Sequence, residues 1–300
     1  PRRQAFGYDV EYSLDSMYFL KDLIDILGEL NWGLHDVVAE GAYSQFELDF
    51  HYTNLLEMAD RLVFLRILLK EVAKKHNMFV TFMPKPTIGD WRSGGHINFS
   101  LQDLKSGKNV FQDGKSWSKK SQFAVGGLLL HSEALTAITC ATVNSYNGLV
   151  PTVGGFEGGV HTWAPVNITY GHNNRSAQFR LPQNRFCIEN RAADMMMNVY
   201  LALAMTVSAA TEGIKNKIDP GKPTDQDLYQ MKDSEFKKLG IRQLPKNLLQ
   251  AIEALKKDKL SDEVLGSVMK KSYLSYKNDE WERYHQAVTD WEVKEYLRLF

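Results

Sequence analysis

The segment 168–191, ITYGHNNRSAQFRLPQNRFCIENR, restricts the fold of this chain more than any other part. Pro182 divides it into two extended segments, because proline cannot donate a hydrogen bond inside a strand ladder. Charged side chains as dense as those here do not pack into an apolar core. We therefore predict two extended segments with a polar face, on which four side chains stand out: Arg175, Arg180, Glu189 and Arg191.

This polar face has two interpretations. Guanidinium groups bind carboxylates and phosphates in bidentate fashion, and a glutamate beside them can stay ionised and hold a hard cation such as Mg²⁺. The same side chains would equally form a surface ladder of cross-strand ion pairs. The ladder is the commoner arrangement, and the segment alone leaves both interpretations open.

The rest of the chain alternates between helical and extended patterns. Helices are expected at about 15–30 (capped by Asp15), 54–75, 122–139 and 195–210, with charged helices at 246–257, 261–276 and 279–299. The buried stripe of the second helix includes Leu55, Leu65, Ile67 and Val72. Strands are expected at 33–40, 45–50, 78–83, 94–101 and 161–187. This order, with a helical end over 222–300, predicts an α+β fold with a mainly antiparallel sheet.

Charge and cysteine content exclude several function classes. Thirty-six basic residues balance 36 acidic ones, so no overall field attracts nucleic acid or an anionic membrane surface. No apolar run approaches the roughly 20 residues that a membrane span needs. The two cysteines, Cys140 and Cys187, fit a reducing compartment, and we expect a cytoplasmic protein.

The polar groups on the expected strand faces indicate metal-assisted phosphoryl transfer. Three carboxylates and one imidazole suit Mg²⁺ or Mn²⁺; they are those of Glu40, Glu47, Glu189 and His96. The three arginines of 168–191 would stabilise a transferring phosphoryl group of ATP. No P-loop or kinase signature is present, so the nucleotide would be held in another way. Each residue also has a plainer explanation as a solvated carboxylate, a structural histidine or an arginine in an ion pair.

An ordered series of motifs narrows the choice. The series comprises AEGAYSQFELDF (39–50), FMPKP (82–86), GGHINFSL (94–101), NSY (144–146), NRSAQFRLP (174–182), IENR (188–191) and GIKNKIDPG (213–221). It resembles the catalytic domain of the glutamine synthetase family over nearly the whole chain, so 1–300 is expected to be one such domain. The stretch TWAPVNITYGHNNRS (162–176) is most similar to the branch that makes γ-glutamyl amides from amines other than ammonia, such as γ-glutamylmethylamide synthetase.

The resemblance implies a half-barrel of antiparallel strands backed by helices, and subunits assembled in stacked rings. It also implies a reaction in which ATP phosphorylates the γ-carboxylate of glutamate and an amine then displaces phosphate from the acyl phosphate. Two or three Mg²⁺ or Mn²⁺ ions would be bound. The expected partners are therefore ATP, a glutamate-like acid, an amine and further copies of the chain, with neither nucleic acid nor a membrane.

The resemblance also assigns roles to individual residues. Glu40 and Glu47 match two ligands of one metal ion, and His96 and Glu189 match ligands of the ion that bridges the ATP phosphates. Arg175 and Arg180 match arginines that contact phosphate, and Arg191 matches one that contacts the glutamate carboxylate or the transferring phosphate. Asn144 falls on the substrate side. Ser100, Asn98 and Arg180 fall on the nucleotide side.

The chain departs from the family pattern mainly on the glutamate side. Trp91 and Arg92 stand where the family has Asn-Gly, Gly148 stands where it has a substrate-binding arginine, and Asn98 replaces a histidine. Glu157 is the one acid in the glycine-rich loop that follows. The N-terminal β-grasp domain and the E-x-E metal strand of the family are expected to be absent from this chain.

These departures leave three functions open. In the favoured one, a γ-glutamyl amide ligase has a remodelled acid pocket, where Arg92 supplies the cation missing at Gly148 and Trp91 packs against a larger or less polar substrate. In the second, Trp91 and Arg92 block the pocket of a non-catalytic structural or regulatory subunit. The third is glutamine synthesis from ammonia.

Overall fold

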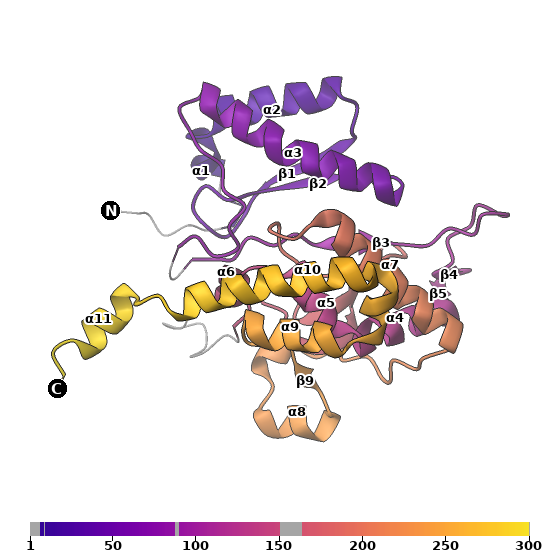
Figure 1. Ribbon diagram of the computed structural model, residues 1–300. Coiled ribbons are helices and arrows are strands. Elements are labelled where there is room, and N and C mark those ends of the chain that lie inside the picture. Colours follow the sequence, from indigo (N-terminus) through magenta and orange to yellow (C-terminus); the bar gives the residue numbers. More distant parts are fainter. Residues whose placement is uncertain (1–6, 9, 88–89, 151–163, 300) are drawn as a thin grey trace.

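The computed structural model describes residues 7–8, 10–87, 90–150 and 164–299. Figure 1 shows a small lobe at the top and a larger body below it. The small lobe consists of α1 (Val10–Leu14), α2 (Met17–Glu29), β1 (Leu34–Ala39), β2 (Phe46–Phe50) and α3 (Leu55–Lys75). Helices and a mixed set of sheets make up the whole, so the α+β class is confirmed.

The small lobe is held together by one apolar core between its two long helices and its hairpin. Phe46, Leu48 and Phe50 of β2 pack on this core, as their alternation predicts. In α3, Leu65 and Val72 are buried, but Leu55 and Ile67 are 42% and 58% exposed, so their predicted burial is wrong. Successive residues of a helix turn by about 100°, which carries Ile67 off the face that Leu65 and Leu69 bury. α2 begins after Ser16, one residue later than the predicted cap.

The main sheet of the body has the strand order β3-β8-β7-β6-β9. Its strands are β3 (Ile97–Phe99), β6 (Asn167–His172), β7 (Ala177–Leu181), β8 (Ile188–Asn190) and β9 (Arg242–Gln243). All pairs are antiparallel except β6–β7, so the sheet is mainly antiparallel, as predicted. The extended segment before Pro182 is divided into two strands at Asn173, whose φ of 53° lies in the left-handed region that asparagine tolerates.

Several predicted elements differ in the structure. Residues 78–83, all described, form no strand; their alternate side chains pack on the small-lobe core without a neighbouring ladder to pair with. The expected helix 122–139 is two helices, α4 (Lys119–Leu130) and α5 (Ser132–Thr139), separated at His131. The helix expected from residue 195 is α7 (Val199–Asn216), because Asn198 caps it by accepting a hydrogen bond from the Leu201 N–H.

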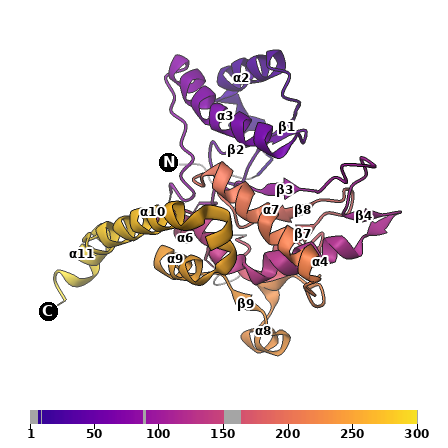
Figure 2. The same cartoon turned by 45° about the vertical axis from the view of Figure 1, so that its right-hand side comes forward.

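The α4 and α7 helices touch through their backbones. A Cβ atom on Gly127 would lie 2.0 Å from the Ala209 carbonyl oxygen, and one on Gly213 would lie 2.1 Å from that of Phe123. Figure 2 shows the two helices side by side next to the strands of the main sheet. The helical layer behind the sheet therefore has a spacing that only glycine at these positions permits.

The C-terminal part is mostly helical. It contains η1 (Leu228–Gln230), α8 (Asp233–Leu239), α9 (Leu248–Lys257), α10 (Lys259–His285) and α11 (Asp290–Tyr296). α10 runs through the predicted break between residues 276 and 279 and kinks instead at Gly266, whose φ is 68°. The remaining elements are α6 (Val143–Gly148) and the hairpin of β4 (Gln112–Asp113) and β5 (Ser116–Trp117). Among the described helices, none is long and apolar enough to cross a membrane.

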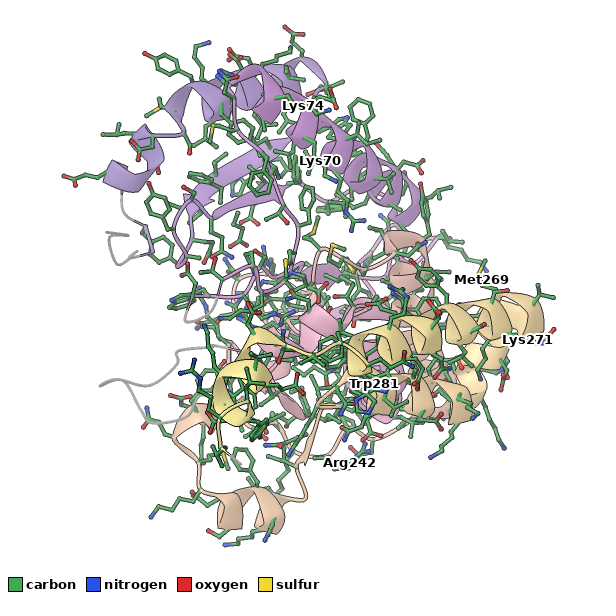
Figure 3. All side chains as sticks on the ribbon, turned by 60° about the vertical axis from the view of Figure 1, so that its left-hand side comes forward. Lys70, Lys74, Arg242, Met269, Lys271 and Trp281 are labelled. Carbon is green, nitrogen blue, oxygen red and sulfur yellow. The ribbon has the colours of Figure 1, made fainter. Side chains whose placement is uncertain are left out.

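Side chains on both lobes and on the C-terminal helices appear in Figure 3, where Lys70 and Lys74 mark α3 in the small lobe and Trp281 marks α10. Trp281 stacks on His285 with their ring centroids 5.8 Å apart. The α11 helix has no buried residue along its seven described positions. Figure 1 shows it projecting from the body beyond the end of α10.

A buried histidine joins three parts of the body. His131 lies 2.6 Å through Nδ1 from Asp258 Oδ2 and 2.8 Å through Nε2 from Glu212 Oε2. Desolvation lowers the pKa of His131, but the two carboxylates outweigh it and raise the pKa above the ordinary 6.5. The protonated ring therefore ties the α4–α5 junction to α7 and to the start of α10.

This arrangement predicts a stability that falls as pH rises. Because the folded pKa is raised, the contribution of the His131 imidazolium is complete below pH 6.5 and is lost as pH rises through the folded value. We expect His131→Gln to lower the free energy of unfolding by about 2 kcal/mol at pH 6, and by less at pH 9. Urea unfolding at both pH values measures this, and an equal loss at the two pH values would contradict it.

Candidate active site

Glu189 is the centre of a charged cluster on three neighbouring strands. Its carboxylate accepts hydrogen bonds of 2.9 Å from Arg180 Nη1 and from Arg191 Nη1, and it lies 3.4 Å from His96 Nδ1. Only 4% of the Glu189 side chain is exposed. Arg180 is paired with Glu189 across β7 and β8, and β3, which follows His96, pairs with β8 on the other side. The structure thus brings together four of the residues predicted from sequence.

The charges and the burial of this cluster determine the protonation of Glu189 and His96. Burial alone would raise the pKa of Glu189, but the positive charges of Arg191 and Arg180 outweigh it and lower the pKa. Desolvation, and then the positive charge of Arg191, lower the pKa of His96 to about 3. At neutral pH the cluster therefore presents an ionised carboxylate and a neutral imidazole, which is the state that binds a metal ion.

A second pair of carboxyl groups lies at the end of the β1–β2 hairpin. Glu40 follows β1 and Glu47 lies in β2, and the turn between them is closed by a 2.8 Å hydrogen bond from the Glu40 N–H to the Gln45 carbonyl oxygen. Desolvation, followed by the hydrogen bond and the charge of Glu40, raises the pKa of Glu47 to about 8. The positive charge of Arg191 lowers the pKa of Glu47 as well as that of Glu189.

These donors fit divalent metal ions as partial coordination shells. Within the described residues, no group of three or more His, Cys, Asp and Glu side chains could hold a metal ion. Each predicted ion would therefore have two protein ligands in this part of the chain, Glu40 with Glu47 or His96 with Glu189. Mg²⁺ binds commonly through one or two carboxylates plus water and substrate phosphates, so two-ligand sites of this kind suit it. Because the pKa of Glu47 is raised, the Glu40–Glu47 pair retains a proton. A bound cation would displace this proton.

Comparison with known proteins shows the family of this chain. The model of a family described as "Glutamine synthetase, catalytic domain" matches residues 1–296. The chain belongs to the glutamine synthetase family. A glutamine synthetase of Methanosarcina mazei is 39% identical over 304 residues, which cover 99% of this chain and 63% of that protein. A glutamate–methylamine ligase of Methyloversatilis universalis is 37% identical over 298 residues, covering 98% of this chain and 66% of that protein.

Solved structures agree with the sequence relatives. A structure described as a GmaS/ADP complex superposes with a TM-score of 0.89 at 32% identity, over 99% of this chain and 67% of that one. GmaS without ligand superposes with a TM-score of 0.87 at 31% identity. The chain spans about three-fifths of the length of several glutamine synthetases that it matches.

Three of the side chains predicted to face the nucleotide or its phosphates are exposed to solvent: those of Asn98, Ser100 and Arg175. Asn98 and Ser100 are exposed on and just after β3, and Asn98 Oδ1 accepts a 3.2 Å hydrogen bond from Arg185 Nη2. Arg175 is exposed between β6 and β7, and its carbonyl oxygen accepts a 3.0 Å hydrogen bond from Arg191 Nε. Sequence reasoning missed Arg185, although it lies in the same arginine-rich segment and the pairing of β3 with β8 brings it to Asn98.

The residues expected on the glutamate side contact other parts of the chain. Arg92 Nη2 donates to the carbonyl oxygens of Ala192 at 2.8 Å and Ala193 at 3.2 Å. A Cβ atom on Gly148 would lie 2.9 Å from Arg92 Cβ, so the arginine fills the space beside this glycine. The Asn144 side chain bonds both backbone groups of Lys85, at 2.8 and 3.0 Å. Glu157 lies outside the described residues.

Proposed function

We propose that the protein is an ATP-dependent carboxylate–amine ligase that forms a γ-glutamyl amide, or a close analogue, through an acyl phosphate. The observation that carries the proposal is the Glu189 cluster with Arg180, Arg191 and His96, next to the Glu40–Glu47 pair. The relative named glutamate–methylamine ligase and the likeness to GmaS support it. Ammonia as the amine is the second candidate, favoured by the relatives named glutamine synthetase.

In this proposal two or three Mg²⁺ or Mn²⁺ ions bind beside Glu40 and Glu47 and beside His96 and Glu189. Bound there, they would neutralise phosphate charge and polarise the transferring group. The guanidinium groups of Arg175, Arg180 and Arg191 stabilise the negative charge on the phosphoryl oxygens. Asn98 and Ser100 line the nucleotide side, where the exposed face of β3 supports this role.

The acid and the amine react on the opposite side of the cluster. Arg191 orients a carboxylate of the glutamate-like acid, and Asn144, Trp91 and Arg92 shape that side of the site. Holding the acyl phosphate and the amine together makes their reaction effectively unimolecular. The amine nitrogen then attacks the acyl carbon and gives up a proton to water; the new C–N bond forms as the C–O bond to phosphate breaks, and phosphate leaves.

The assembly belongs to the same proposal. The main sheet and the β1–β2 hairpin would form parts of one half-barrel, and copies of the protein would assemble in stacked rings. The α11 helix supports contacts between copies, because apolar side chains on it and just after it are exposed among the described residues; they include Trp291, Val293, Tyr296 and Leu297. Mass photometry of the full-length protein measures the number of subunits, and a monomer at micromolar concentration would contradict this part.

The experiment that tests the function is turnover by the full-length protein with ATP, Mg²⁺, glutamate and a panel of amines. ADP release and the amide product are both measured, with methylamine and ammonia compared at equal concentrations. We expect amide formation with at least one alkylamine. A protein that shows neither turnover nor metal-dependent ATP binding would instead be the non-catalytic subunit that the departures at Trp91, Arg92 and Gly148 raise as an alternative.

A substitution at Glu47 should separate metal binding from stability. Because the raised pKa makes the folded chain retain a proton that the unfolded chain releases, Glu47 costs stability increasingly as pH rises from 4.5 towards about 8. We expect Glu47→Gln to raise the unfolding free energy of the metal-free protein by about 1 kcal/mol at pH 8, and less at pH 5, while one Mn²⁺ site is lost. Mn²⁺ binding by electron paramagnetic resonance and urea unfolding measure the two effects. A loss of stability at pH 8 would contradict the assignment.

A further inference from the structure

Trp91 covers the turn that follows Glu40. A Cβ atom placed on Gly41 would lie 2.4 to 2.8 Å from three atoms of the Trp91 ring, so the indole rests directly on the Gly41 backbone. The Gly41 N–H is also 3.3 Å from Glu40 Oε2. The position of the indole therefore determines where the turn, and with it the Glu40 carboxylate, can lie.

Arg92, the next residue, holds the loop that follows Arg191. Its guanidinium binds the carbonyl oxygens of Ala192 and Ala193 and lies 3.9 Å from the buried carboxylate of Asp194. Only 7% of the Arg92 side chain is exposed. Since its Nη2 group is committed to two main-chain carbonyls, Arg92 acts on the site through the backbone that positions Arg191.

Further hydrogen bonds join the same short segment, residues 91–95, to the rest of the site. Gln45 Nε2 donates to the Arg92 carbonyl oxygen at 3.0 Å and to Ser93 Oγ at 3.2 Å, which ties the hairpin turn to the segment 91–95. The Gly95 N–H donates to the Ala193 carbonyl oxygen at 2.9 Å, directly before His96. One segment thus touches the neighbours of Glu40, His96 and Arg191.

This link matters because the two halves of the site belong to different sheets. In the described part of the chain, β1 and β2 form a sheet of their own and share no strand pairing with the main sheet. No backbone ladder therefore sets the distance from the Glu40–Glu47 pair to the Glu189 cluster. A misplacement of about 1 Å in a reacting constellation can cost about a hundredfold in rate.

We propose that Trp91 and Arg92 are positioning residues that clamp the Glu40 turn to the Arg191 loop and so set the spacing between the two metal-binding halves of the site. The proposal rests on the proposed ligase function and deepens it. Gly148 is part of the clamp, because any side chain there would displace Arg92. The clamp differs from a direct contact with the acid substrate, in which the Arg92 guanidinium would bind the substrate carboxylate.

The test compares Trp91→Leu, Arg92→Lys and Gly148→Ala in the full-length protein. Each should lower kcat by about 10- to 100-fold while changing the KM for glutamate by less than about threefold. Each should also change the Mn²⁺–Mn²⁺ coupling measured by electron paramagnetic resonance with ADP bound. Tyr200→Phe is the control, since it removes another link between the lobes, the 2.6 Å hydrogen bond to Asp60, which involves none of the clamp residues; it should leave kcat and the coupling unchanged.

Three results would overturn the clamp. The first is a KM for glutamate raised more than about tenfold in Arg92→Lys with kcat retained, which is the signature of direct substrate contact. The second is an unchanged Mn²⁺ coupling in all three variants, each checked to be folded by circular dichroism. The third is an effect of Tyr200→Phe as large as theirs. If the wild-type protein shows no ligase turnover, the proposed function fails, while the Mn²⁺ coupling still decides for or against the clamp.

Discussion

Glu189→Gln should reduce ligase turnover by about a thousandfold and also destabilise the protein. The carboxylate is almost fully buried and faces two guanidinium groups at 2.9 Å. An amide of the same shape removes the negative charge that faces both guanidinium groups, a change that costs about 3–5 kcal/mol at buried pairs. It also removes one of the two protein ligands of the proposed nucleotide-side metal ion. We expect lower kcat, lower Mn²⁺ affinity and a lower unfolding free energy together.

Asp279→Asn is a matched control for this substitution. It removes the carboxylate from an arginine pair in α10, with Arg283 Nε 2.8 Å from Asp279 Oδ2, but both side chains are 64% exposed. Exposed pairs of this kind contribute about 0–1 kcal/mol, so activity and stability should stay nearly unchanged. In both variants, the rate of ADP release measures turnover, Mn²⁺ titration measures metal affinity, and urea unfolding measures stability. Retention of wild-type turnover by Glu189→Gln would remove Glu189 from the site.

Gly127→Ala should be the most destabilising single methyl addition in the described body. The new Cβ would lie 2.0 Å from the Ala209 carbonyl oxygen and 2.7 Å from the Gly213 nitrogen, and both are backbone atoms of α7 that no side-chain rotation can move. Overpacking in a closed core costs about 1–3 kcal/mol, and more where backbones must separate. We expect a loss of about 3 kcal/mol or more, because α4 and α7 must move apart along their shared length.

The matched control is Gly28→Ala in α2. A Cβ atom there meets nothing within 4 Å, and alanine is the better helix former by about 1 kcal/mol. The same chemical change should therefore stabilise the small lobe slightly. Urea unfolding of the two variants measures the contrast, and a stability of Gly127→Ala within about 1 kcal/mol of the wild type would show that the helices can separate without cost.

Local patterns in the sequence predict the elements and the charged cluster well. Phe46, Leu48 and Phe50 alternate because one face of a strand is buried, and this pattern needs no knowledge of distant residues. The arginines and Glu189 lie in one short segment, so their meeting depends only on neighbouring strands. Where sequence reasoning failed, the deciding partner was distant. Residues 78–83 alternate like a strand but find no strand to pair with, and His131 interrupts an apolar helix because Asp258 and Glu212 bind its ring.

The roles of Trp91 and Arg92 show the same limit of local reasoning. Their replacement of smaller residues is visible in the sequence, but the direction of each side chain is set by contacts far along the chain. Trp91 meets Gly41, and Arg92 passes Gly148 to reach Ala192. The sequence of Trp91 and Arg92 is compatible both with lining a substrate pocket and with positioning other residues. Only the packing of the two side chains distinguishes these roles.

The division into two lobes has a consequence for how the protein opens. The small lobe is built from residues close in sequence, whereas α4 meets α7 across a long loop of chain. Contacts between residues close in sequence form quickly, and different units of a protein open at different free energies. Amide hydrogen exchange should therefore proceed as two cooperative units, with the α2–α3 unit opening first and carrying the Glu40 turn with it. In that partly open state Glu40 and Glu47 would move away from the Glu189 cluster, which would stay intact.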